Sequence, residues 1–212
     1  SYKPISIHLS IDGSGSMQGK KWDEVLINTI ALGYVSLNMN NIDLTISIRT
    51  TGIDPNLSSQ TEHIPLLILA FNSKKHTVKD LKKLGNFIAR GLTPEGMCLN
   101  VLNNYIPKSS YYLDSYLINM SDGFPTFESS AFKYKGKSAI LDTAKAVNNI
   151  KKKGVKVLSY FIESPTGYVK LNELIKDFRI MYGKSATFID PKNVNQVTKT
   201  LNNLFLKRDL VS

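Results

Sequence analysis

Alternating and continuous runs of apolar residues divide the chain into short predicted strands and amphipathic helices. Residues 5–11 alternate apolar with polar side chains up to Asp12-Gly13, a pattern typical of a strand that ends in a turn. Residues 21–38 repeat apolar side chains at helical spacing, with acidic residues near the start, where a helix dipole favours negative charge. The same patterns predict further strands at 42–48, 65–71, 113–120, 155–162 and 186–189, and further helices at 77–88, 95–105, 138–153, 171–181 and 194–206.

The order of these segments predicts the fold class. Strands alternate with helices, so we expect an α/β fold with an open, mostly parallel sheet of about six strands and helices on both faces. The polar stretch 50–63 joins strands 42–48 and 65–71 without a helix, which predicts one antiparallel edge strand. The uninterrupted apolar run at 65–71 also predicts a strand buried on both faces. We expect residues 124–137 to form a long loop.

The chain shows no repeat, low-complexity tract or linker, so residues 1–212 are expected to form one domain. It begins at Ser1 without an initiator methionine, and we therefore expect a fragment or processed product of a longer protein. No run of about 18 apolar residues predicts a membrane span. The single cysteine, Cys98, excludes an intramolecular disulfide and a cysteine-based metal site, and it favours a cytoplasmic location.

The formal net charge of +10 leaves two interpretations open. A strongly basic chain is able to bind nucleic acid or another polyanion. Its lysines, however, are spread along helix ends and loops and are not interleaved with stacking aromatic residues. This distribution favours a solvated, lysine-rich surface over a nucleic-acid interface.

Several oxygen-bearing side chains follow the ends of predicted strands. Asp12, Ser14 and Ser16 come directly after the first strand, and Asp122 follows the strand that ends near residue 120. Thr93 lies in the loop between them in sequence. In an open α/β sheet, ligands bind beyond the carboxyl ends of the strands, near the switch in strand order. We therefore expect these side chains to converge there.

The chemistry of this set suits a hard divalent cation. Mg²⁺ prefers roughly octahedral oxygen coordination and usually keeps several waters, and Mn²⁺ or Ca²⁺ would accept the same ligands. Hydroxyls with one or two carboxylates bring little negative charge, so the metal would stay electrophilic and accept a carboxylate from outside. Gly13 and Gly15 are expected to let the backbone turn sharply enough to aim both serines at one point.

These residues resemble a known family. Asp12-Gly13-Ser14-Gly15-Ser16 matches the Asp-x-Ser-x-Ser motif of von Willebrand factor A (vWA) domains, the core of their metal-ion-dependent adhesion site (MIDAS). Thr93 stands where that family places its metal-site threonine, and Asp122 matches the aspartate after the fourth strand. The resemblance implies that the serines and Thr93 coordinate the metal directly or through water, and that the two aspartates act partly through waters.

The resemblance also implies a function: cation-dependent binding of an acidic residue on a partner protein. The segments around Asp12, Thr93 and Asp122 are more similar to intracellular, prokaryotic or phage-type members than to integrin or collagen-binding domains. Those members include cobaltochelatase-subunit-like proteins that work beside AAA+ ATPases. An accessory role in such a metal-chelatase-like complex is therefore an alternative.

An enzyme is a further alternative, in which the metal would support hydrolysis or phosphoryl transfer. Such chemistry needs a general base, and position suggests only Glu95 and Glu128. No nucleophile is identified, since Ser14 lacks the flanking glycines of a nucleophile elbow. In isolation Asp12, Ser14 and Ser16 would also suit a turn that caps the next helix. We expect a binding module without catalytic residues.

Overall fold

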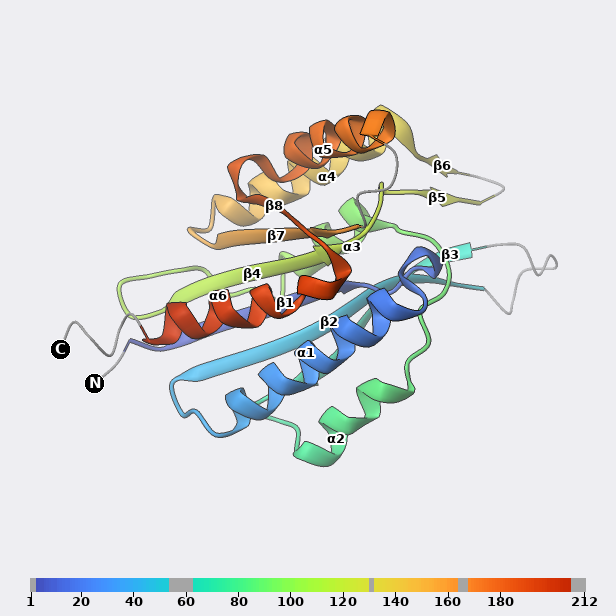
Figure 1. Cartoon of the computed structure of the whole chain (residues 1–212). Coiled ribbons are helices and arrows are strands. Elements are labelled where there is room, and N and C mark those ends of the chain that lie inside the picture. The colour runs from blue at the N-terminus through green and yellow to red at the C-terminus, as the bar shows by residue number, and fades with distance from the viewer. Residues whose placement is uncertain (1–2, 54–62, 130–131, 164–167, 207–212) are drawn as a thin grey trace.

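Six strands form one sheet in the order β3-β2-β1-β4-β7-β8. The computed structural model describes residues 3–53, 63–129, 132–163 and 168–206 (Figure 1). The strands are β1 (Ile5–Asp12), β2 (Ile42–Ile53), β3 (His63–Asn72), β4 (Asp114–Ser121), β7 (Lys156–Ile162) and β8 (Ala186–Ile189). All neighbours pair in parallel except β2 and β3, which are antiparallel, so the predicted α/β sheet with one antiparallel edge strand is confirmed.

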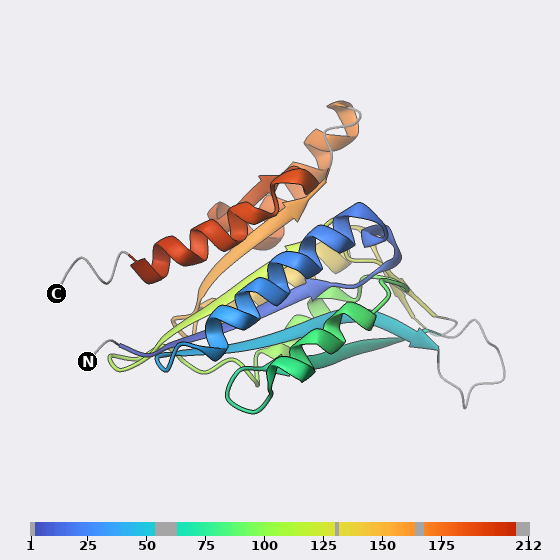
Figure 2. The same cartoon turned by 60° about the horizontal axis from the view of Figure 1, so that its bottom comes forward.

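Helices cover both faces of the sheet (Figure 1). One layer contains α1 (Lys20–Leu37), α2 (Val78–Lys82) and α6 (Asn195–Leu206); in Figure 2, α1 and α6 run across this face and α2 lies beside α1. The other layer contains α3 (Glu95–Leu102), α4 (Gly136–Lys151) and α5 (Tyr168–Tyr182). Short 3-10 helices are η1 (Gly15–Met17), η2 (Lys83–Asn86), η3 (Gly183–Ser185) and η4 (Pro191–Asn193). None of the helices in the described ranges combines the length and apolar character that a membrane span requires.

Strand β1 has one apolar and one polar face. Its odd-numbered residues, from Ile5 to Ile11, are buried in the core beneath α1 and α6. Its even-numbered residues face the α3 layer, where His8 and Ser10 are almost fully buried. The His8 imidazole lies 2.9 Å from the Ser47 hydroxyl. Burial and, less strongly, the charge of Arg49 lower the pKa of His8 to about 4, so its ring is neutral at pH 7.

A buried polar network links the sheet to the α3 layer. The Arg49 guanidinium lies 3.2 Å from the Glu95 carboxylate, and neither side chain is exposed. The same Glu95 oxygen accepts hydrogen bonds from the Tyr182 hydroxyl at 2.6 Å and the Asn119 amide at 3.2 Å. Arg49 also donates to the Ser10 hydroxyl at 2.6 Å. An isolated buried charge is energetically costly, so the buried Arg49 guanidinium and the buried Glu95 carboxylate each need the other to compensate their charge.

Three details differ from the sequence-based expectations. Strand β3 is not buried on both faces: Ile68 and Leu69, which point to opposite faces, are 36% and 45% exposed, because β3 is an edge strand and neither helix layer covers it fully. The helix predicted at 77–88 breaks after Lys82 into a 3-10 turn. The stretch 50–63 is only partly loop, since β2 continues to Ile53 and β3 begins at His63; residues 54–62 lie outside the described residues.

The long segment 124–137 also differs from the expected loop. It contains a small hairpin of β5 (Phe127–Glu128) and β6 (Lys133–Tyr134), and α4 already begins at Gly136. Phe127 and Tyr134 are buried with Ala139 in a separate apolar cluster. Packing of these aromatic rings explains the local order.

The buried ion pair generates a stability prediction. Glu95→Ala leaves the Arg49 charge buried without its partner, and the free energy of unfolding should fall by about 3–5 kcal/mol in urea titrations. Glu128→Ala is the control, because Glu128 is 45% exposed and contacts Lys133 and Lys135 only at 3.5 Å; it should change stability by less than about 1 kcal/mol. Equal effects of the two substitutions would contradict the role given to the network.

Candidate metal centre

The register between β1 and β4 brings two strand ends together. Ile11 pairs with Met120, so Asp12 and Ser121 are the next residues on adjacent parallel strands. The Ser121 hydroxyl donates to Asp12 Oδ2 at 3.2 Å, and the Ser14 backbone N–H donates to Asp12 Oδ1 at 2.9 Å. Asp12 is completely buried. Its carboxylate is therefore fixed at the carboxyl end of the sheet.

The loop after β1 is held against two neighbouring segments. The Gly13 N–H donates to the Arg49 carbonyl at 2.7 Å, and the Arg90 N–H donates to the Gly13 carbonyl at 2.8 Å. A Cβ atom at Gly13 would lie 2.5 Å from Ile48 Cγ2, so only glycine permits this approach. A sharp backbone turn does not explain why glycine is needed here, because neither Gly13 nor Gly15 has a positive φ angle.

The hydroxyls of this loop join Asp12 to Asp122. Ser14 Oγ lies 3.0 Å from Ser16 Oγ, and Ser16 Oγ donates to Asp122 Oδ1 at 2.7 Å. Ser14 and Asp122 are buried, whereas Ser16 is exposed. The structure thus brings Asp12, Ser14, Ser16 and Asp122 into one chain of contacts that reaches the surface at Ser16.

Thr93 is placed on an adjacent loop. Its backbone N–H and carbonyl each bond to Thr126 at 2.8 Å, and its side chain is almost fully buried. The loop is tied to the metal motif because the Gly15 N–H donates to the Gly91 carbonyl at 3.0 Å. Among the contacts of the described residues, none joins the Thr93 hydroxyl to the other predicted ligands, so its participation stays a prediction.

The observed oxygen spacings suit a small octahedral ion. Adjacent ligands of Mg²⁺, each at 2.0–2.1 Å from the metal, lie about 2.9 Å apart. The Ser14–Ser16 and Ser16–Asp122 oxygen separations of 3.0 and 2.7 Å are those of hydrogen bonds in the metal-free chain, and they also lie close to this value. Within the described residues there is no group of three or more His, Cys, Asp or Glu side chains arranged to hold a metal. A metal here would depend on hydroxyls and two carboxylates, which is the donor set expected from the sequence.

The electrostatic environment of Asp12 also favours a cation. Burial is the main influence and raises the pKa of Asp12 to about 6; Arg49 opposes the shift, and the charges of Asp122 and Glu95 add to it. The ionised carboxylate is therefore destabilised in the metal-free chain at pH 7. A divalent cation beside it would relieve this penalty.

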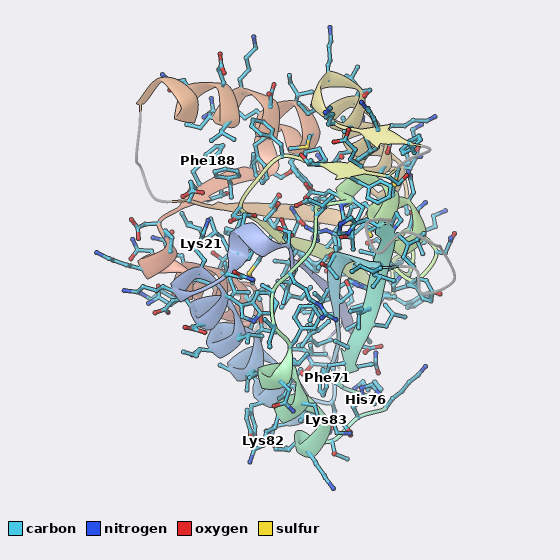
Figure 3. The ribbon with its side chains drawn as sticks, turned by 90° about the vertical axis from the view of Figure 1, so that its right-hand side faces the viewer. Lys21, Phe71, His76, Lys82, Lys83 and Phe188 are labelled. Atoms are coloured by element: carbon cyan, nitrogen blue, oxygen red, sulfur yellow. The ribbon has the colours of Figure 1, made fainter. Side chains whose placement is uncertain are left out.

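Two charged residues near the site were missed by the sequence analysis. The Lys21 ammonium forms a short contact with Asp122 Oδ2 and lies 3.2 Å from Glu163 Oε2. Figure 3 looks toward the carboxyl ends of the strands and shows Lys21 at the start of α1. Glu163 directly follows β7, so the strand-end rule that selected Asp12 and Asp122 would also have selected it. Lys21 carried no comparable signal, because many lysines occupy helix ends in this chain.

Comparison with known proteins supports the fold. No family model matches the chain, and no curated protein matches it. The vWF domain of the type V pili tip protein Mfa5 from Porphyromonas gingivalis is similar in structure, with a TM-score of 0.63 and 12% identity over 95% of this chain and 96% of that one. A von Willebrand factor type A structure from Catenulispora acidiphila gives a TM-score of 0.56 and 15% identity over 95% of this chain and 42% of that one. The chain has a vWA-like fold.

The vWA-like fold also occurs within a larger protein. The pilus adhesin SpaC from Lactobacillus rhamnosus GG gives a TM-score of 0.65 and 14% identity, and the match covers 94% of this chain. The chain spans only 30% of the length of that adhesin. At such identities the similarity shows the fold alone. The predicted vWA fold is confirmed, while the metal site and the cobaltochelatase-like subgroup stay predictions.

The burial of Asp12 generates a pH-dependent prediction. Its folded pKa of about 6 exceeds the unfolded value of 3.8, so the metal-free folded chain holds the extra proton and loses stability as pH rises from 4 to 6. Asp12→Asn removes the buried charge and should raise the free energy of unfolding at pH 7 by about 1–3 kcal/mol. Urea titrations in EDTA at pH 7 and pH 4.5 measure this gain, which should shrink at the lower pH. A destabilised Asn variant at pH 7 would refute the argument.

Proposed function

We propose that the chain is a divalent-cation-dependent protein-binding module that recognises an acidic residue of a partner. One observation carries the proposal: at the carboxyl ends of β1 and β4, Ser16 Oγ lies 3.0 Å from Ser14 Oγ and 2.7 Å from Asp122 Oδ1. Strand order reverses here, since β2 lies on one side of β1 and β4 on the other. Ligand sites of open α/β sheets occupy this position.

The roles of the individual residues follow from their placement. Ser14, Ser16 and Thr93 would offer hydroxyl oxygens to Mg²⁺, and Mn²⁺ or Ca²⁺ would be alternatives. Asp12 and Asp122 would compensate its charge, with Asp12 anchored below the site by Ser121. The bound metal would supply an electrophilic centre for a carboxylate. Access would come from the side of Ser16, the exposed member of the set.

The similar structures support binding as the role. SpaC is a pilus adhesin, and Mfa5 is a pilus tip protein. vWA-like domains commonly mediate protein–protein interaction, and we extend that role to this chain. None of the structures named above is described as a chelatase subunit, so the AAA+ partner and the cytoplasmic location remain predictions of the sequence alone.

We favour binding over catalysis because, among the contacts of the described residues, neither suggested general base bonds to the predicted metal ligands. Glu95 is fully buried and bonded to Arg49, Tyr182 and Asn119. Glu128 lies on the β5–β6 hairpin near Lys133 and Lys135. A general base must reach the proton that it removes, and the contacts of Glu95 and Glu128 hold neither carboxylate against the metal centre.

Metal binding is tested directly with the isolated chain. Mg²⁺ or Mn²⁺ should raise the thermal unfolding temperature, because a ligand that binds only the folded state stabilises it by mass action. Asp12→Ala and Ser14→Ala should remove this increase. Ser138→Ala is the matched serine control, since Ser138 lies at the start of α4 and bonds to the Lys135 carbonyl. If neither cation shifts the wild-type unfolding temperature or gives heat in calorimetry, the proposed metal site is wrong.

Partner binding is tested by capture from the native lysate. Wild-type chain in Mg²⁺ should retain a partner that is lost in EDTA and with Asp12→Ala. Binding through net charge alone would behave differently, because it would fall steeply with salt and ignore EDTA. Capture that is equal with Mg²⁺ and EDTA would therefore argue against the proposed function.

A further inference from the structure

The amino group of Lys21 occupies a position between two carboxylates at the rim of the metal centre. It contacts Asp122 Oδ2 at short range and Glu163 Oε2 at 3.2 Å. The Lys21 side chain is only 19% exposed, and that of Asp122 is fully buried. These contacts join the first turn of α1 to the ends of β4 and β7. Lys21 therefore belongs to the site and not to the solvated lysines of the surface.

The contacts of Asp122 are divided between its two oxygens. Oδ1 accepts from the Ser16 hydroxyl at 2.7 Å, and Oδ2 accepts from Lys21. A carboxylate held from both sides cannot rotate freely. Its negative charge is also compensated by an ammonium group before any metal arrives.

We propose that Lys21 is the internal counter-cation of the metal centre: it fixes Asp122 and offsets one unit of negative charge, so that the site binds a divalent cation more weakly, and is more positive when loaded, than it would be without Lys21. This inference rests on the proposed function. Asp12, Asp122, Glu163 and Lys21 together carry a net charge of −2, which becomes 0 with a divalent cation. Without Lys21 the corresponding values are −3 and −1, and the loaded centre attracts a partner carboxylate less strongly.

Lys21 is paired with both Asp122 and Glu163, and a lysine ammonium is ordinarily charged at pH 7. Glu163 holds the ammonium from the outer side of the site. Changes at Lys21 and Glu163 should therefore shift metal affinity in opposite directions.

The experiment measures the Mn²⁺ dissociation constant by calorimetry on the whole chain. Lys21→Met removes the charge but keeps the length of the side chain, and should tighten Mn²⁺ binding about tenfold, since a cation near the metal is lost. Lys21→Arg keeps the charge and should stay within about threefold of wild type. Glu163→Gln should weaken binding by a few fold. Lys20→Met is the matched control, because Lys20 is the exposed neighbour, and it should leave the affinity unchanged.

Acetate supplies a second measurement, as a probe of the carboxylate position. If acetate binds the loaded centre, it raises the apparent Mn²⁺ affinity by linkage. This gain should be smaller in Lys21→Met than in wild type. Circular dichroism on each variant establishes that it is folded, and Glu163→Gln tests the same charge argument with Lys21 in place.

The outcomes separate the two proposals. Wild-type binding of Mn²⁺ with unchanged or weaker binding in folded Lys21→Met overturns the role of Lys21 and leaves the proposed function standing. Absence of Mn²⁺ binding in the wild type and in all variants overturns the proposed function. Binding that appears only in Lys21→Met supports the counter-cation role and refutes metal dependence of the natural chain.

Discussion

The parallel pairing of β1 between β2 and β4 is the constraint on which the rest of the structure depends. It buries the apolar residues of β1 beneath α1 and α6 and turns the polar residues toward the α3 layer. It also sets the register that places Asp12 beside Ser121, one residue before Asp122. Because parallel strands end at the same edge, the packing that stabilises the sheet also assembles the candidate site.

Burial of charge is the second principle that connects fold and site. Arg49 and Glu95 are paired inside the protein, with Tyr182 and Asn119 completing the contacts of Glu95. Asp12 lies close enough to this pair for both charges to influence its pKa, yet burial still raises that pKa to about 6. The chain therefore holds a carboxylate that is costly without a cation, as functional sites often do. The stability of the surrounding sheet offsets the free-energy cost of the buried Asp12 charge.

Charges are also partly compensated at the rim of the site. Lys21 partly neutralises Asp122, and Glu163 in turn engages Lys21. In the proposed site, hydroxyls from Ser14 and Ser16 would add ligands without adding charge. Together these groups describe a centre of low net charge at the end of the sheet, open at Ser16. Such a centre suits reversible recognition of an anion, since a metal with fewer anionic ligands stays electrophilic.

The sequence by itself determined the alternation of strands and helices, the antiparallel edge and the residues of the Asp-x-Ser-x-Ser loop, because periodicity and strand-end position are local properties. It misjudged β3, since an apolar run does not reveal whether a strand lies at an edge, and it missed the β5–β6 hairpin, which depends on packing of Phe127 and Tyr134. It assigned Gly13 to a turn, whereas contact with Ile48 from another strand requires it. Only the tertiary structure decided the surroundings of Asp122: Lys21 and Glu163 are distant from it in sequence, and the charges meet because α1 begins at the edge of the sheet where β4 and β7 end.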